Sequence, residues 1–249
     1  MSTGYAQVNG LNMYYEERGT GSPLLLLHGG VMTVELSFAA MLPELAGRFR
    51  VIAPELQGHG HTADVDRPIT MGGLAEDVRG LLDHLGIERA AVFGFSLGGL
   101  TALQIALAHP ERISALMVAS TPFRPDGFHR EITDPELWAT SERMPSEDDF
   151  RAMHEAYAKV APDPDHFEAF MAKATEAAHT FEGWPEERLR GIAAPTMIVV
   201  GDTDFVTLDH ATEMRDLIPG AQLAVLPGTK HQDVATRPEL LSMIDRFLP

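Results

Sequence analysis

Cysteine is absent from the 249 residues of this chain, so disulfide bonds and thiolate metal sites are excluded. Basic residues are few as well: 19 Lys and Arg stand against 36 Asp and Glu, which gives a formal net charge of −17. Nucleic acids and anionic membrane surfaces attract clustered Lys and Arg. We therefore expect neither of them as a partner.

Long apolar runs are also missing. None approaches the roughly 20 residues that a membrane-spanning helix needs. The first residues lack the basic region and apolar stretch of a signal peptide, so we expect a cytoplasmic protein. What the chain does have is 45% hydrophobic residues, enough for a large core in one α/β domain with an insertion.

Short apolar segments alternate with amphipathic ones along most of the chain. Strands are predicted at residues 6–8, 11–17, 24–27, 51–53, 90–93, 113–119, 196–200 and 221–226. The Asn9-Gly10 pair predicts a tight hairpin between the first two strands. This alternation predicts a doubly wound, mostly parallel sheet with the hairpin at one edge.

The stretch 122–190 differs in character from the rest. It is charged, helix-prone and broken by prolines, with helices predicted at 135–140, 147–160 and 165–180. The strand–helix pattern continues on both sides of it. We therefore expect a core domain formed by residues 1–121 and 191–249, with residues 122–190 as a helical cap, or lid, inserted into it.

Gly94-Phe95-Ser96-Leu97-Gly98 joins a buried strand to an apolar helix. A strand-to-helix turn this tight pushes the serine towards positive φ and crowds its neighbours. Glycine at positions 94 and 98 relieves that crowding. The turn would present the Ser96 hydroxyl at the edge of the sheet, above the N-terminus of a helix.

Three further strand ends carry reactive or glycine-rich groups: His28-Gly29-Gly30, Asp204 and the stretch that leads to His231. Ligands bind at the carboxyl ends of strands in an open parallel sheet. A serine hydroxyl needs a base, and the base needs an acid that orients it. Along the chain the three groups come in the order Ser96, Asp204, His231, which is the order expected when the serine lies on such a strand-to-helix turn. Asp202 is the competing acid, although a role in capping its turn suits it better.

Together these motifs resemble an α/β-hydrolase-fold protein with a helical cap, in the capped serine hydrolase (carboxylesterase- or lactonase-like) branch. The resemblance covers the whole chain and implies an eight-stranded sheet with the cap after strand 6. It also implies Ser96 as nucleophile, Asp204 as acid and His231 as base, with Gly30 and Leu97 as oxyanion-hole donors and no cofactor. A serine at the elbow points away from the dehalogenase and epoxide-hydrolase branches, which use aspartate there.

The chain departs from the family pattern at three positions. Glu55 and Thr62 replace the usual Asp and Ser in the loop after the fourth strand, and Lys230 replaces the usual Gly before the base. Lys230 either acts on the base as a neighbouring cation or extends into solvent. His59 and His61 form His-x-His without a third ligand at metal-site spacing, so no metal is expected.

Apolar side chains of the cap are expected to pack its helices together, and some of them to line the pocket. The candidates for substrate contact are Met32, Phe95, Trp138, Phe150, Met153, Tyr157 and Phe170. His28 is expected to shape the oxyanion loop through a structural hydrogen bond.

The expected function is hydrolysis of a carboxylic ester or lactone through an acyl-enzyme, the chemistry of a carboxylesterase. The expected partner is a small to medium, partly hydrophobic substrate molecule, with a second copy of the chain in a homodimer left open. One alternative is a hydrolase of C–C bonds in ring-cleavage products, which predicts inward-facing cations for a substrate carboxylate. The cap offers Arg124, Arg130, Arg143, Arg151, Lys159 and Lys173 for that role. Another alternative is a ligand receptor on the same fold that does not turn its ligand over.

Overall fold

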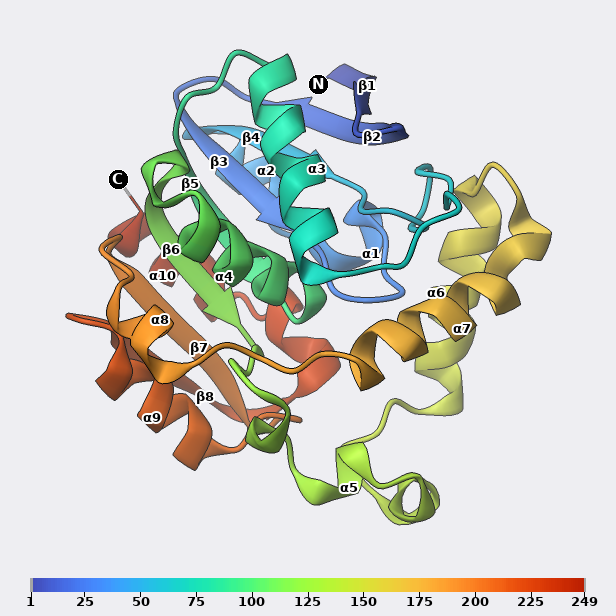
Figure 1. The fold of residues 1–249 in the computed structure, drawn as a ribbon, viewed down its shortest axis with the longest axis vertical. Helices are drawn as coiled ribbons and strands as arrows, with labels where there is room; N and C mark the ends of the chain where they lie inside the picture. The colour runs from blue at the N-terminus through green and yellow to red at the C-terminus, as the bar shows by residue number, and fades with distance from the viewer. Residues whose placement is uncertain (1, 249) are drawn as a thin grey trace.

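An eight-stranded sheet forms the centre of the computed structural model, which describes residues 2–248 (Figure 1). The strand order is β1-β2-β4-β3-β5-β6-β7-β8, and only β1–β2 and β2–β4 pair antiparallel. The strands are β1 (Ser2–Val8), β2 (Leu11–Arg18), β3 (Ser22–Leu27), β4 (Phe49–Pro54), β5 (Ala90–Phe95), β6 (Ile113–Ala119), β7 (Thr196–Thr203) and β8 (Gln222–Lys230). The predicted mostly parallel sheet is confirmed.

The hairpin at the sheet edge turns at Asn9 and Gly10, as predicted. Their φ angles of 48° and 81° are both positive, and Val8 pairs with Leu11 across the turn. Two positive φ angles suit the right-handed twist of the flanking strands.

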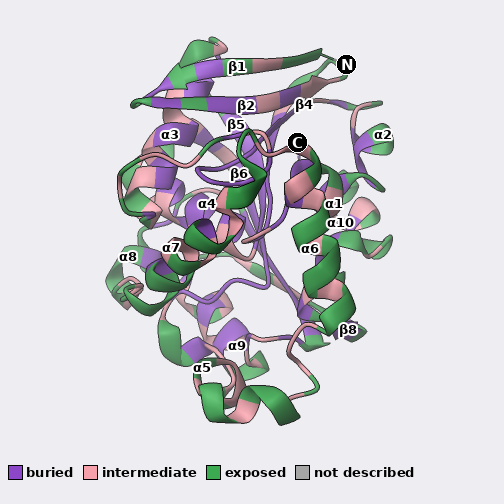
Figure 2. Cartoon of the chain, turned by 90° about the vertical axis from the view of Figure 1, so that its right-hand side faces the viewer, coloured by how far each residue is buried: buried purple, intermediate pink, exposed green. Residues whose placement is uncertain are grey.

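Helices cover both faces of the sheet (Figure 2). Alternate strand residues pack on opposite faces. Leu25 and Leu27 pack against one set of helices, while Leu24 and Leu26 pack against the other. The first set is α3 (Met71–His84), α4 (Leu97–Ala108), α8 (Glu186–Arg190) and α9 (Leu208–Leu217). The second set is α1 (Val34–Phe38), α2 (Leu42–Leu45) and α10 (Glu239–Phe247). Buried on both faces, β3 needs its unbroken apolar sequence.

Helices are the main elements of the chain between β6 and β7, and irregular stretches join them; we call residues 122–190 the helical segment. Its elements before α8 are η2 (Pro125–Gly127), α5 (Arg130–Thr133), η3 (Pro135–Thr140), α6 (Glu147–Val160), η4 (Pro164–His166) and α7 (Phe167–His179). The helix predicted at 147–160 is confirmed as α6. The one predicted at 135–140 is a 3₁₀ helix, and 165–180 divides into the end of η4 followed by α7.

Helices α5, α6 and α7 lie beside the end of the sheet at which the parallel strands finish (Figure 1). The remaining short elements are η1 (Pro110–Arg112) and η5 (His231–Thr236). None of the helices in residues 2–248 combines the length and the apolar character needed to cross a bilayer.

Candidate active site

The turn from β5 into α4 holds Ser96 at φ 52° and ψ −115°, so the predicted positive φ is confirmed. A Cβ atom on Gly94 would lie 2.4 Å from the carbonyl oxygen of Gly98. One on Gly98 would lie 2.1 Å from the carbonyl oxygen of Leu27. Only glycine fits at either position, and this close packing supports the strained serine between them.

Ser96, His231 and Asp204 form one continuous chain of hydrogen-bonding contacts. His231 Nε2 lies 3.0 Å from Ser96 Oγ, and His231 Nδ1 lies 2.7 Å from Asp204 Oδ1. The three residues come from the ends of β5, β8 and β7. Because a carboxylate only accepts, Nδ1 carries the proton and Nε2 is left free to accept from the serine hydroxyl.

Asp204 is fully buried and has four hydrogen-bond donors around its carboxylate. Besides His231, these are the Ser120 hydroxyl and the backbone N–H groups of Gly201 and Phe205. Burial alone would raise the pKa of Asp204, but the His231 charge and the hydrogen bonds from His231, Ser120 and Gly201 outweigh it and hold the pKa below its usual value. The carboxylate is therefore ionised at neutral pH.

Asp202, the competing acid, has a different role. Its side chain is exposed and accepts a hydrogen bond of 3.1 Å from the backbone N–H of Thr229. This contact ties the end of β7 to β8. Of the two aspartates, Asp204 is the one in contact with His231.

Two phenyl rings pack around the His231 imidazole. Phe205 stacks flat on it, with ring centroids 3.9 Å apart and planes 4° apart. Phe95 approaches at 5.2 Å and 41°. Lys230, whose role the sequence left open, has an exposed side chain.

The loop after β3 brings Gly30 next to Leu97 at the start of α4. A Cβ atom on Gly30 would lie 3.7 Å from Leu97 Cβ. The first N–H groups of a helix have no partner within it. His28 anchors this loop: burial lowers its pKa to about 3, and its Nε2 accepts a 3.0 Å hydrogen bond from the backbone N–H of Leu56. His28 therefore makes a structural hydrogen bond at this loop, as expected.

Glu55 bridges the same loop to the loop after β4. Its Oε1 accepts from the N–H of Val34 at 3.1 Å, and its Oε2 accepts from the backbone N–H and Nδ1 of His61 at 2.6 and 2.8 Å. The Thr62 hydroxyl donates to the Glu55 carbonyl and accepts from the N–H of Tyr14. The two substituted positions therefore interact with each other and with both neighbouring loops.

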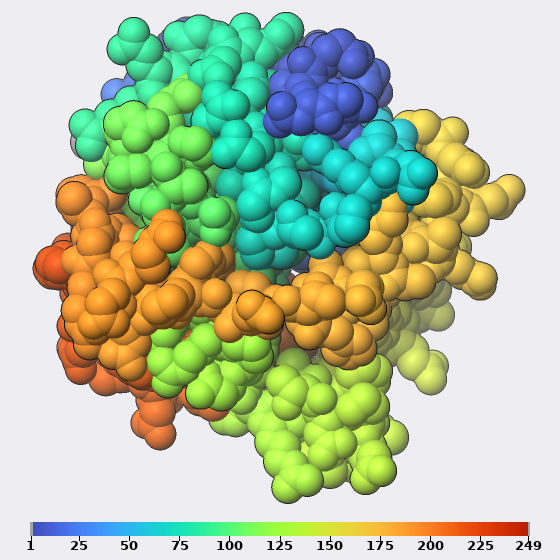
Figure 3. Space-filling view, viewed as in Figure 1, coloured from blue at the N-terminus to red at the C-terminus, as the bar shows by residue number. Residues whose placement is uncertain are grey.

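A cavity of about 360 Å³ opens above Ser96, between the strand ends and the helical segment. Its wall is mostly apolar: Gly30, Val31, Met32, His59, Ile69, Met71, Phe95, Ser96, Leu97, Leu100, Phe128, Ile132, Met144, Pro145, Phe150, Met153, Met171, Ala174, Thr175, Ala177, Ala178, Phe181, Phe205, His231 and Gln232. Figure 3 shows orange atoms of the helical segment against teal atoms that lead into α3, with a narrow hollow between them. Ile69 and Phe181 line the cavity from these two parts of the chain.

Four of the seven pocket candidates line this cavity: Met32, Phe95, Phe150 and Met153. The other three lie elsewhere, which corrects the expectation for them. Trp138 is 42% exposed and donates its indole N–H to the Ile132 carbonyl. Tyr157 and Phe170 stack on each other, with centroids 5.7 Å apart and planes 3° apart, and are buried.

Sequence reasoning missed several residues of the wall. Phe128, Met144, Met171, Phe181 and Phe205 all line the cavity. The four in the helical segment have no motif, and apolar spacing alone does not separate them from helix-packing residues. Phe205 directly follows the predicted acid, which was the one available signal.

The six cations considered for a substrate carboxylate do not line the cavity wall. Each pairs with an acidic side chain: Arg124 with Glu213, Arg130 with Asp134, Arg143 with Glu131, Arg151 with Asp148, Lys159 with Glu35 and Lys173 with Asp64. Within residues 2–248, no three His, Asp or Glu side chains are placed to hold a metal ion.

The helical segment also contacts the strand end that carries Asp204. Arg143 Nη1 donates to the Asp204 carbonyl at 2.7 Å, and the His129 N–H donates to the Phe205 carbonyl at 2.8 Å. An isolated bridge joins Phe128 to Val206. The helical segment thus holds the backbone at Asp204 and Phe205.

The chain belongs to the alpha/beta hydrolase fold family, whose model matches residues 22–173. It is accordingly a hydrolase of that fold. It is 26% identical to the 2-hydroxy-6-oxo-6-phenylhexa-2,4-dienoate hydrolase of Burkholderia cepacia, over 90% of this chain and 86% of that one.

Two solved structures extend the similarity over nearly the whole chain. Est816, described as an N-acyl homoserine lactone degrading enzyme, is 27% identical with a TM-score of 0.78, covering 98% of this chain and 100% of its own. The enol-lactonase of Burkholderia xenovorans LB400 is 25% identical with a TM-score of 0.77, covering 98% and 99%.

Proposed function

We propose that this hydrolase cleaves a carboxylic ester or lactone of a neutral, small to medium, partly hydrophobic substrate through an acyl-enzyme. The observation that carries the proposal is the hydrogen-bonded set Ser96–His231–Asp204 at the floor of an apolar cavity. Its volume of about 360 Å³ lies within the range of small-molecule sites.

In the proposed mechanism, Ser96 Oγ attacks the substrate carbonyl while His231 Nε2 takes its proton. Asp204 keeps the imidazole oriented and stabilises its charged form. The N–H groups of Gly30 and Leu97 donate to the oxygen of the tetrahedral intermediate, a contribution worth about 3–4 kcal/mol for each donor. His231 then protonates the leaving alcohol, and water, activated by the same histidine, releases the acid.

The C–C hydrolase alternative has less support. The relative from Burkholderia cepacia acts on a dienoate, which is a carboxylate. The cations expected for such a substrate are paired with acids outside the cavity wall. The lactone-cleaving relatives agree better with a wall that carries no Lys or Arg. A receptor on the same fold would retain the connected acid, base and serine, so only turnover distinguishes it from the enzyme.

The test is hydrolysis of p-nitrophenyl esters of increasing acyl length and of γ- and δ-lactones. We expect measurable turnover that falls about 10⁴-fold or more in a folded Ser96→Ala variant. A single burst without turnover would support the receptor instead. Equal rates for wild type and Ser96→Ala would refute the proposed mechanism. A meta-cleavage dienoate, added to the panel, should be a poor substrate.

A further inference from the structure

The end of β6 lies between the strands that lead to Ser96 and Asp204, because the three neighbouring strands come in the order β5-β6-β7. The last residue of β6, Ala119, accepts a hydrogen bond of 2.9 Å from the backbone N–H of Ser96. The next residue, Ser120, donates its hydroxyl to Asp204 Oδ2. Two consecutive residues therefore connect the serine of the β5 turn with the carboxylate that follows β7.

Ser120 has an unusual backbone conformation for a residue with a side chain. Its φ is 55°, in the left-handed region that favours glycine. Within residues 2–248, three further residues other than glycine have a positive φ. Asn9 lies in the hairpin turn, whereas Val31 follows Gly30 and Ser96 is the proposed nucleophile. Strained residues of this kind cluster at functional sites, where the surrounding structure holds them in place.

Neighbouring groups hold Ser120 in this conformation. Its exposed fraction is 1%, and its backbone N–H donates to the Val199 carbonyl of β7 at 2.9 Å. The Thr121 hydroxyl donates back to the Ala119 carbonyl at 2.8 Å. A Cβ atom on Gly99 of α4 would lie 1.8 Å from that hydroxyl oxygen, so the helix packs directly against the turn. The backbone of Ser120 is thus fixed on both sides, while its side chain is directed at Asp204.

The two carboxylate oxygens of Asp204 have separate partners. Oδ1 contacts His231 Nδ1 and accepts from the N–H of Phe205. Oδ2 accepts from the Ser120 hydroxyl and from the N–H of Gly201. Of the two donors to Oδ2, Ser120 is the one that comes from outside β7. Glycine would adopt the φ of Ser120 without strain, but it would leave that oxygen with one donor fewer.

We propose that Ser120 is a positioning residue, whose hydroxyl fixes Asp204 in the orientation that His231 needs during proton transfer. Its backbone strain follows from placing a hydroxyl where glycine would fit best. A carboxylate held from two strands keeps its geometry as the imidazole gains and loses charge, which is what a preorganised site requires. The inference rests on the proposed function, because it assigns a role in the same proton transfer.

The test compares Ser120→Gly with Ser120→Ala, which both remove the hydroxyl but differ in backbone strain. On a p-nitrophenyl ester, kcat should fall about ten-fold in both, the effect of losing one hydrogen bond to a charged group. KM should change little, because Ser120 is not part of the cavity wall. The glycine variant should have the higher Tm of the two, since alanine is strained at positive φ. The rate would thus follow the hydroxyl, and the stability would follow the backbone.

Thr196→Val is the matched control. Thr196 is as buried as Ser120, and its hydroxyl donates to the Ala194 carbonyl at the other end of β7 from Asp204. Its kcat should stay close to wild type. An unchanged kcat in both Ser120 variants would overturn the inference. A loss of kcat in Ser120→Ala that is absent from Ser120→Gly would also overturn it, because the rate would then follow stability. If Ser120→Ala does not fold, Ser120→Gly decides alone.

A spectroscopic readout separates this inference from the proposed function, because it needs no turnover. The proton that His231 Nδ1 shares with the carboxylate should give a low-field NMR resonance, identified by its loss in Asp204→Asn. This resonance should shift in both Ser120 variants and stay in place in Thr196→Val. A shift without ester hydrolysis by the wild type would support the role of Ser120 and reject the ester hydrolase. Hydrolysis by the wild type, with kcat and the resonance unchanged in both variants, would do the opposite.

Discussion

Phe205 lies flat on the imidazole of His231, and its backbone N–H donates to Asp204 Oδ1 at 2.6 Å. One residue therefore contacts both Asp204 and His231. The stacked ring limits rotation of the imidazole, and the amide holds the carboxylate. On this geometry, Phe205 is a positioning residue for the proposed acid–base pair of Asp204 and His231.

Replacing Phe205 by Leu should lower kcat, because the leucine keeps apolar volume but loses the stacked face. Aromatic stacking is worth about 0.5–1.5 kcal/mol, so kcat should fall about two- to twelve-fold. Steady-state kinetics on a short-chain ester, for which KM should change little, provide the measurement. Phe205→Tyr keeps the ring and should retain most of the rate. Wild-type kcat in the leucine variant would contradict the role.

Substitution of Asp204 and substitution of Asp202 should have clearly different effects on kcat. Asp204→Asn removes the acceptor that fixes the His231 tautomer, and kcat should fall about 10⁴-fold. Asp202→Asn changes an exposed group that contacts Thr229, so kcat should stay close to wild type. A comparable loss in both variants would mean that the acid had been assigned to the wrong site.

Arg143 should contribute to both stability and rate through its bond to the Asp204 carbonyl. Arg143→Met should lower the free energy of unfolding by about 1.5 kcal/mol, the lower end for a hydrogen bond that involves a charged group. It should also lower kcat. Chemical denaturation and ester kinetics provide the measurements.

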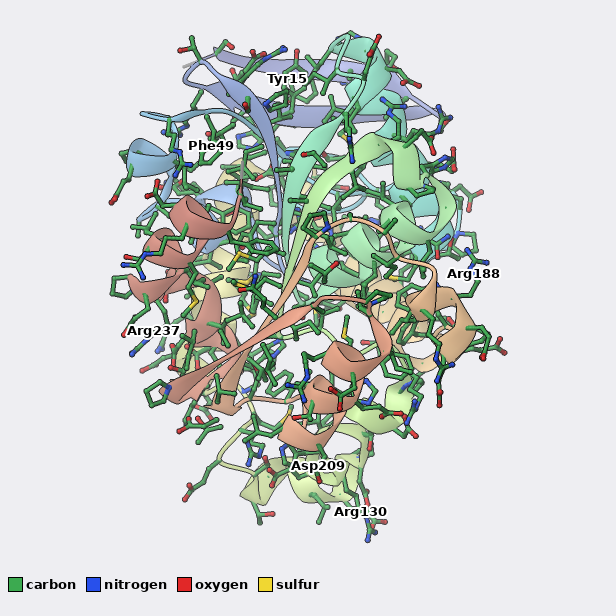
Figure 4. The ribbon with its side chains drawn as sticks, turned by 90° about the vertical axis from the view of Figure 1, so that its left-hand side faces the viewer. Tyr15, Phe49, Arg130, Arg188, Asp209 and Arg237 are labelled. Carbon is green, nitrogen blue, oxygen red and sulfur yellow. The ribbon has the colours of Figure 1, made fainter. Side chains whose placement is uncertain are left out.

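Arg130→Met is the control for Arg143. The Arg130 side chain is 85% exposed, and Figure 4 places it at the outer edge of the molecule. A surface ion pair of this kind contributes little, so neither quantity should change. Equal effects in the two variants would argue against a specific contact with Asp204.

Three buried histidines should make the protein sensitive to acid. Burial lowers the pKa of His28 to about 3 and those of His59 and His210 to about 4, all below the unfolded value of 6.5. Between pH 6.5 and 4 the unfolded chain binds more protons, so stability falls as pH falls. Each histidine contributes about 1.4 kcal/mol per pH unit. Urea titrations at several pH values give the free energy of unfolding as a function of pH. This free energy should change less steeply with pH in His210→Gln than in wild type, and as steeply as in wild type in the control His84→Gln, whose side chain is exposed.

His61 should have the opposite effect on the pH dependence of stability. Its hydrogen bond with Glu55 raises the pKa of His61 above 6.5 despite partial burial. Its stabilising contribution is therefore complete below pH 6.5 and is lost as pH rises through the folded-state value. The difference in Tm between wild type and His61→Gln should shrink from pH 6 to pH 9. A difference that stays constant over this range would contradict the prediction.

The parts of the site that the sequence predicts are those with strict local requirements. Gly94 is needed by the turn itself, so Ser96 could be placed at a strained turn before any tertiary contact was known. The constraint at Gly94 is readable because it depends on a few neighbouring residues. Asp204 and His231 stood at strand ends with reactive groups, but their assignment as acid and base came from the resemblance to the α/β-hydrolase family.

The pocket wall was harder to predict, because it depends on how helices dock. Tyr157 and Phe170 have the same apolar character as Phe150 and Met153, yet they face each other while the latter two face the cavity. Helical spacing identifies the apolar face of a helix, but it does not tell whether that face packs on another helix or lines a cavity. Arg143 was predicted only as one of six cations, since its partner lies 61 positions further along the chain.

The helical segment leaves the sheet after β6 and returns at β7, and these two strands are paired neighbours. A stretch of any length can therefore be exchanged between them without moving another strand. Arg143 limits this modularity, because it reaches from the exchangeable part to the fixed carbonyl of Asp204. A chimera that takes its cap from a relative would inherit new substrate preferences, but it would keep full catalytic rate only if the graft also supplied a donor to that carbonyl.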